Sequence, residues 1–105
     1  MFVVRKTIGI TKDSRNEFIE RFNHDSPLFK AAGFIKREVL LNDSLADRDI
    51  IVIHLYWQDK TDYIAWQRSP VHMELHKAKA KLGKPANILS KEKEMFTLIN
   101  EHSAV

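Results

Sequence analysis

The chain has 105 residues and no cysteine, and its 17 basic and 14 acidic side chains give a net charge of +3. This length predicts a single domain, residues 1–105, with one modest core. The missing cysteine excludes disulfides, thiolate metal sites and cysteine nucleophiles. The small positive net charge is compatible with an anionic ligand, but it does not by itself indicate binding to nucleic acid. No apolar run approaches a membrane span and no signal peptide is visible, so we expect a cytoplasmic protein that binds neither nucleic acid nor a membrane.

The first half of the chain alternates strand and helix patterns. β-branched residues predict the first strand, and a Ser-x-x-Glu capping box opens the helix after it. Serine followed by proline predicts the start of a short second helix, which stops at a glycine. In chain order, the expected elements are a strand over Phe2–Ile10, a helix beginning at Ser14, a short helix over Pro27–Ala32 and a strand over Phe34–Leu41.

The second half repeats this alternation. Its first strand is apolar on both faces, which predicts a position inside a sheet. Aspartate and serine caps open the two helices that follow, and the long connection behind them is typical of a mobile segment. The expected elements are a strand over Ile50–Trp57, a helix from the Asp59 cap through Trp66, a helix over Pro70–Leu82, a connection over Leu82–Glu92 and a strand over Glu94–Glu101.

The order strand, helix, two strands, helix, strand (βαββαβ) is that of the split βαβ, ferredoxin-like α+β sandwich. Helices would cover one face of its sheet. The other face also carries apolar side chains and needs a cover. A second copy of the chain is the simplest cover, so we expect a homodimer whose paired sheets form a dimeric α+β barrel.

Two histidines stand four residues apart on the helix over Pro70–Leu82, at His72 and His76. The glutamate between them is not in the position that a zinc peptidase requires, so that class is rejected. Two surface histidines on a basic helix are one reading of the pair. In the other, a core stripe of Val71, Leu75, Ala78 and Leu82 leaves His76 at its edge, where imidazole can ligate haem iron.

Three further features bear on a ligand site. Trp57 ends the strongest strand and is expected to be a core anchor, whereas Trp66 is expected to line a cavity with His76. Lys6 shares an apolar strand face, where it either reaches solvent from an edge strand or meets an anion. The lysines at the end of the long helix complement its dipole and can also meet ligand carboxylates; they are Lys77, Lys79, Lys81 and Lys84.

The stretch from Trp57 to Ser69 followed by His76-Lys77 resembles the antibiotic biosynthesis monooxygenase (ABM) superfamily, and within it the IsdG-like haem-degrading monooxygenases. A tryptophan ends the third strand, a second follows nine residues on, and His-Lys follows ten residues later. Gly33-Phe34 at the start of the second strand also matches. The resemblance covers nearly the whole chain.

The resemblance implies a homodimeric barrel with one haem per subunit, in which haem is both substrate and cofactor. His76 would be the proximal iron ligand, and Trp66 would press on the porphyrin and ruffle it. Phe22, on the apolar side of the first helix, is also expected to contact the haem. With an external electron donor and dioxygen, such enzymes open the porphyrin and release iron.

Lys6 falls where the family has a distal asparagine. A lysine there can donate to bound oxygen or to a propionate, but it has no acceptor. Two alternatives therefore stay open beside haem degradation. One is an ABM-superfamily monooxygenase acting on a non-haem aromatic small molecule. The other is a non-catalytic dimeric module that binds a small-molecule ligand.

Overall fold

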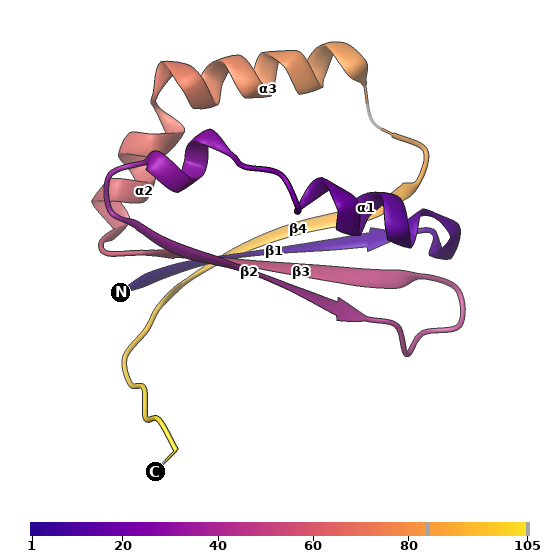
Figure 1. Cartoon of the computed structure of the whole chain (residues 1–105), viewed down its shortest axis with the longest axis horizontal. Coiled ribbons are helices and arrows are strands. Elements are labelled where there is room, and N and C mark those ends of the chain that lie inside the picture. Colours follow the sequence, from indigo (N-terminus) through magenta and orange to yellow (C-terminus); the bar gives the residue numbers. More distant parts are fainter. Residues whose placement is uncertain (84, 105) are drawn as a thin grey trace.

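The computed structural model describes residues 1–83 and 85–104. Four strands form one antiparallel sheet in the order β2-β3-β1-β4, and the helices lie on one of its faces (Figure 1). This arrangement confirms the ferredoxin-like α+β fold. The elements are β1 (Phe2–Ile10), η1 (Lys12–Ser14), α1 (Arg15–Arg21), η2 (Pro27–Lys30), β2 (Phe34–Asn42), β3 (Asp49–Trp57), α2 (Lys60–Gln67), α3 (Pro70–Leu82) and β4 (Ile88–Thr97).

The core lies between the sheet and the helices, on the side to which alternate residues of β1 and β3 point. Val4, Ile51 and Trp57 are fully buried there. Trp57 packs edge-on against Phe34, with ring centroids 5.1 Å apart. The prediction that Trp57 is a core anchor is therefore confirmed, as is the interior position of the third strand, because β3 lies between β2 and β1.

The last strand begins earlier than predicted. β4 covers Ile88–Thr97, so the expected long connection Leu82–Glu92 and the expected strand Glu94–Glu101 are both wrong in their bounds. Ile88 is buried in the core, and the backbone N–H of Thr11 donates to the carbonyl of Asn87 at 3.0 Å, which fixes the entry into the strand. Four of the ten residues of this edge strand, Lys91 to Glu94, form a charged run of a kind common at sheet edges, and this run obscures the hydrophobic pattern of the strand.

Two of the four predicted helix caps form. The Ser26 and Ser69 hydroxyls accept hydrogen bonds from the backbone N–H groups of Leu28 and His72, at 3.2 and 3.3 Å. The predicted caps at Ser14 and Asp59 are absent, although the helices begin there. The Ser14 hydroxyl instead donates to the carbonyl of Thr11 at 2.7 Å. The short helix predicted over Pro27–Ala32 is the 3-10 helix η2.

The predicted core stripe of α3 is wrong. None of its described side chains is buried, and Val71, Leu75 and Leu82 are 48%, 41% and 88% exposed. The helix packs mainly against α2 and arches over the sheet (Figure 1). The apolar side chains of α3 therefore face space that this single chain does not fill. The described helices include none long and apolar enough to cross a membrane.

The protein exposes more surface than its mass predicts. The accessible surface is 7649 Å², whereas the scaling for compact monomers gives about 6,100 Å² at this mass. The radius of gyration is 15.1 Å, against about 13 Å for a compact domain of this length. Both differences agree with a helix that stands off the sheet and a sheet with one uncovered face.

Candidate functional site

Three aromatic rings form a continuous row where α2 meets α3. The ring centroids of Trp66 and His72 are 5.3 Å apart, and those of His72 and His76 are 4.5 Å apart. The structure thus brings the predicted pair Trp66 and His76 to one place, with His72 between them. Ser69 caps α3 and sets the start of the helix, which puts both histidines on one face.

The sequence singled out His76 as the histidine at the edge of the core stripe, but His72 is the more buried of the pair. His72 is half-buried, whereas His76 is exposed. Burial, followed by the charges of His76 and Lys6, lowers the pKa of His72. His72 is therefore neutral at pH 7. The sequence did contain a signal for this row, because Trp66 precedes the start of α3 and His72 follows it. Spacing alone does not say which of the two imidazoles is the more buried.

Lys6 lies in the middle of β1, which is an interior strand, so the prediction that it reaches solvent from an edge strand is wrong. Its neighbours across the sheet are Ile53 on β3 and Lys93 on β4. The side chain is half-buried on the helix-covered face. Burial is the largest cause that lowers the pKa of Lys6, followed by the charges of Lys79, Lys93 and Lys91.

A buried tyrosine that the sequence analysis did not single out joins the sheet to α2. The Tyr63 hydroxyl accepts a hydrogen bond from Lys93 Nζ at 3.0 Å and one from Gln67 Nε2 at 2.6 Å. Tyr63 is 4% exposed and packs against Phe2 and Trp57. This contact fixes Lys93 on the helix-covered face, next to Lys6.

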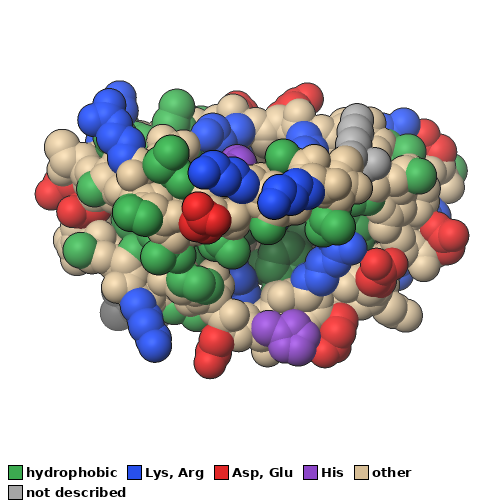
Figure 2. Space-filling view, turned by 90° about the horizontal axis from the view of Figure 1, so that it is seen from above, with side chains coloured by type: hydrophobic (Ala, Val, Ile, Leu, Met, Phe, Trp, Pro, Cys, Tyr) green, Lys and Arg blue, Asp and Glu red, His purple; other side chains and the backbone are tan. Residues whose placement is uncertain are grey.

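The helix-covered side of the molecule is hollowed. Figure 2 looks onto this side and shows hydrophobic side chains at the bottom of the hollow, with Lys and Arg side chains beside it. A pocket of about 470 Å³ opens on the same side and is lined by Trp66 and Val71 together with residues of η2 and α2. His76 and Lys6 do not line that pocket, so the predicted site residues border more than one space.

Phe22, the third expected ligand contact, immediately follows α1. It is partly buried against the core, and the Arg37 guanidinium lies 5.1 Å from its ring centroid and donates to its carbonyl at 2.7 Å.

Lys77 is exposed and pairs with Glu74 at 3.7 Å. Lys84 lies outside the described residues. Among those residues, no group of three or more His, Cys, Asp or Glu side chains has the arrangement of a metal site.

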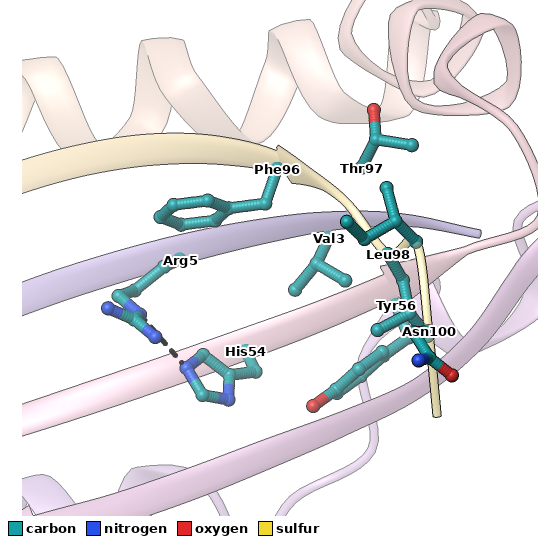
Figure 3. A pocket seen from close by; sticks show the side chains of 9 residues that line it. Val3, Arg5, His54, Tyr56, Phe96, Thr97, Leu98 and Asn100 are labelled. Atoms are coloured by element: carbon teal, nitrogen blue, oxygen red, sulfur yellow. Dashed lines mark hydrogen bonds between the residues drawn. The ribbon is translucent and has the colours of Figure 1, made fainter. Parts of the chain in front are cut away.

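The uncovered face of the sheet carries a separate polar network. His54 Nε2 accepts from Arg5 Nε at 3.1 Å, which leaves the proton on Nδ1, facing Glu38 Oε1 at 3.3 Å. Tyr56 donates to the same carboxylate oxygen at 2.6 Å, and this hydrogen bond is the largest cause that raises the pKa of Tyr56, to about 12. Arg5, His54 and Tyr56 line a pocket of about 280 Å³ together with Phe96 (Figure 3).

Comparison with known proteins shows the family to which the chain belongs. Residues 1–78 match the family model described as antibiotic biosynthesis monooxygenase. A haem-degrading monooxygenase from Bacillus thuringiensis subsp. konkukian (strain 97-27) is 34% identical over 76 residues, which are 72% of this chain and 71% of that protein. The matched stretch of the family model includes Lys6, Trp66, His72 and His76.

Solved structures share the fold. MhuD, a haem degrader from Mycobacterium tuberculosis solved with two haems in its active site, superposes with a TM-score of 0.69 at 18% identity, over 98% of this chain and all of that chain (100%). A monooxygenase from Streptomyces coelicolor, solved with the ligand nanaomycin D, gives a TM-score of 0.70 at 17% identity, over 99% of this chain and 92% of that chain.

Proposed function

The chain belongs to the antibiotic biosynthesis monooxygenase family, and from that premise we propose that it binds haem beside α3 and oxidatively opens the porphyrin, releasing iron. The observation that supports this most directly is the row Trp66, His72, His76, in which two imidazoles adjoin a tryptophan that lines the pocket of about 470 Å³. Haem is the substrate in this proposal and also activates dioxygen during its own degradation.

The residues present fit a haem. An imidazole is a good ligand of haem iron, and His76 offers one from the exposed side of the row. Half-exposed apolar side chains of α3 provide the surface on which a porphyrin would be buried; they include Val71 and Leu75. Covering each 100 Å² of such surface contributes about 2.5 kcal/mol. In this proposal Phe22 adds an apolar contact from the opposite side.

Each residue then has a physical task. His76 holds the iron and sets the distance between α3 and the porphyrin. Trp66, whose indole packs against His72, would press on the porphyrin face. Burial lowers the pKa of His72, which favours its neutral imidazole. Electrons come from an external donor.

We also propose that the working unit is a homodimer in the form of an α+β barrel. The uncovered sheet face carries apolar side chains, among them Leu40 and Phe96, which are 47% and 40% exposed. Three polar side chains on that face, Arg5, His54 and Glu38, are already paired with one another. A second copy can therefore bury the face without leaving these groups unpaired.

A second candidate function is oxygenation of a non-haem aromatic small molecule. Lys6 favours it, because a half-buried cationic amine on this face suits an acidic phenol or enolate. The Streptomyces coelicolor monooxygenase of the same fold was solved with nanaomycin D rather than haem. In this function His76 does not bind iron.

Substitution of the two histidines separates the candidates. His76→Ala should abolish the haem absorbance complex in the visible spectrum, whereas His72→Ala should retain an iron-ligated spectrum, because only His76 is expected to bind the metal. The matched pair controls for damage to α3, since both changes remove an imidazole from the same helix. Equal haem spectra for both variants and the parent would show that His76 is not the ligand.

A further inference from the structure

Four lysines converge beneath α3. Lys6 on β1 faces Lys93 directly across the strand pair, and Lys91 faces Ile8, two residues along β1 from Lys6. Because strand residues two apart share a face, all three lie on the helix-covered side. Lys79 approaches from α3 and is among the charges that act on Lys6. We call these four residues, Lys6, Lys79, Lys91 and Lys93, the lysine cluster.

The cluster is not neutralised by acidic neighbours. Every charged group that shifts the pKa of Lys6 is a lysine, and every one that shifts the pKa of His72 is a lysine or histidine. The alternating residues of β4 that carry carboxylates, Glu92 and Glu94, pair with Thr7 and Arg5 and so lie on the opposite face of the sheet. Among the described residues, Asp49 is a carboxylate buried on the helix side, but it is already paired with Lys12 and Arg15 and so does not neutralise the cluster.

Keeping these amines together costs stability. Like charges directly opposite each other in an antiparallel pair are destabilising. A half-buried lysine also loses hydration that a hydrogen-bond partner normally replaces. Tyr63 supplies such a partner for Lys93. An anion bound between the strands and α3 would provide a hydrogen-bond partner for the other lysines of the cluster.

The cluster lies beside the residues to which the proposed function assigns its substrate. Lys79 stands three residues after His76 on α3, so the two side chains share a helix face, and the ring of His76 contacts that of His72. The hollow seen from the helix side combines a hydrophobic bottom with cationic surroundings. That combination suits a planar apolar body that carries carboxylates at one edge.

We propose that the lysine cluster is the anion subsite of the ligand site, which selects planar aromatic ligands bearing carboxylates and, for haem, holds the propionates. This inference rests on the proposed function for the identity of the porphyrin, but it assigns Lys6 to the ligand's carboxylates rather than to dioxygen. Its chemistry does not involve iron.

Metal-free protoporphyrin IX tests the subsite without iron ligation. Its binding to the full chain is followed by porphyrin fluorescence, and its dimethyl ester, in the same buffer, serves as the uncharged analogue. We expect the free acid to bind about tenfold more tightly than the ester, the scale of one charge-assisted hydrogen bond. Added salt should weaken binding of the acid and leave the ester unchanged.

Two variants and one control locate the effect. Lys6→Gln and Lys93→Gln should each weaken binding of the free acid about five- to tenfold and leave binding of the ester unchanged. Lys60→Gln removes an exposed lysine of α2 that lies outside the cluster and should change neither. Circular dichroism of each variant verifies that it is folded, and Lys6→Arg should retain binding of the acid if the charge is what matters.

The subsite is overturned if the ester binds as tightly as the acid, if both glutamine variants bind the acid like the parent, or if the parent does not bind the acid. These results are distinct from failure of the proposed function, which concerns iron. Loss of the haem spectrum in His76→Ala with unchanged acid binding in Lys6→Gln would keep the function and reject the subsite. Lysine-dependent acid binding without a His76-dependent haem spectrum would do the reverse.

Discussion

At the scale of single residues, the polar side chains of this protein divide into satisfied and unsatisfied sets. Asp49 belongs to the first. It is fully buried and receives hydrogen bonds from Arg15 Nε at 2.7 Å and from Lys12 Nζ at 3.0 Å. These contacts tie η1 and α1 to the start of β3. Lys6 belongs to the second set, because no hydrogen bond joins it to another described side chain, and in our proposal it binds the ligand's carboxylates.

Asp49 makes a prediction about pH. The hydrogen bond from Arg15 is the largest cause that lowers the pKa of Asp49 from 3.8 to about 2. A carboxyl with a depressed pKa stabilises the fold fully above its unfolded pKa, and this contribution is lost as the pH falls through the folded value. Asp49→Asn should therefore lower the melting temperature most above pH 5, with the deficit shrinking toward pH 2. A deficit that is constant with pH would contradict this account.

The sequence predicted the chemistry of the site better than the orientation of its members. Trp66 and His76 lie in one row, with His72 between them, because α3 begins at the Ser69 cap directly after α2. The inward position of His72 was missed, because residues four apart share a helix face and spacing cannot rank them.

At the scale of elements, the helices and strands were mostly predicted because the local signals agreed with the final packing. Ser69-Pro70 begins α3 as expected, and Gly83 ends it. Prediction failed where tertiary contacts decide the structure. The edge strand β4 has a charged run at its centre rather than a hydrophobic run, and the apolar side chains of α3 stay exposed among the described residues.

The cap of α3 gives a test of how the site helix is held. The Ser69 hydroxyl accepts from the backbone N–H of His72, so Ser69→Ala should cost about 1 kcal/mol of unfolding free energy. Asp59 stands at the start of α2 but makes no cap hydrogen bond, so Asp59→Ala should cost less. Denaturant unfolding of both variants measures the difference. Equal losses would mean that the Ser69 hydrogen bond does not stabilise α3.

At the scale of the whole molecule, the surface area points to partners. The excess over a compact monomer is roughly 1,500 Å², whereas one partner of a standard protein interface buries about 800 Å². In our proposal, a second chain covers the uncovered sheet face and a ligand occupies the space beside α3.

Dimerisation through the sheet face is testable with one substitution. Phe96 lies on that face with the Arg5 guanidinium 5.1 Å from its ring centroid. Phe96→Asp should convert a dimer into the 12.3 kDa monomer in sedimentation experiments, because it places a carboxylate in the apolar contact. Leu82→Asp, on α3 and 88% exposed, is the matched control and should remain dimeric. A monomeric parent, or a dimeric Phe96→Asp, would reject this interface.

The most direct test of the central claim is a haem titration of the parent protein, followed in the visible spectrum and then treated with ascorbate in the presence of catalase. The account predicts a Soret band that saturates at one haem per chain and then decays as the porphyrin is opened and iron is released. A saturable band that persists under reductant would indicate a haem binder rather than an enzyme. If no saturable band forms, haem is not the ligand of this site, and the proposed function is wrong.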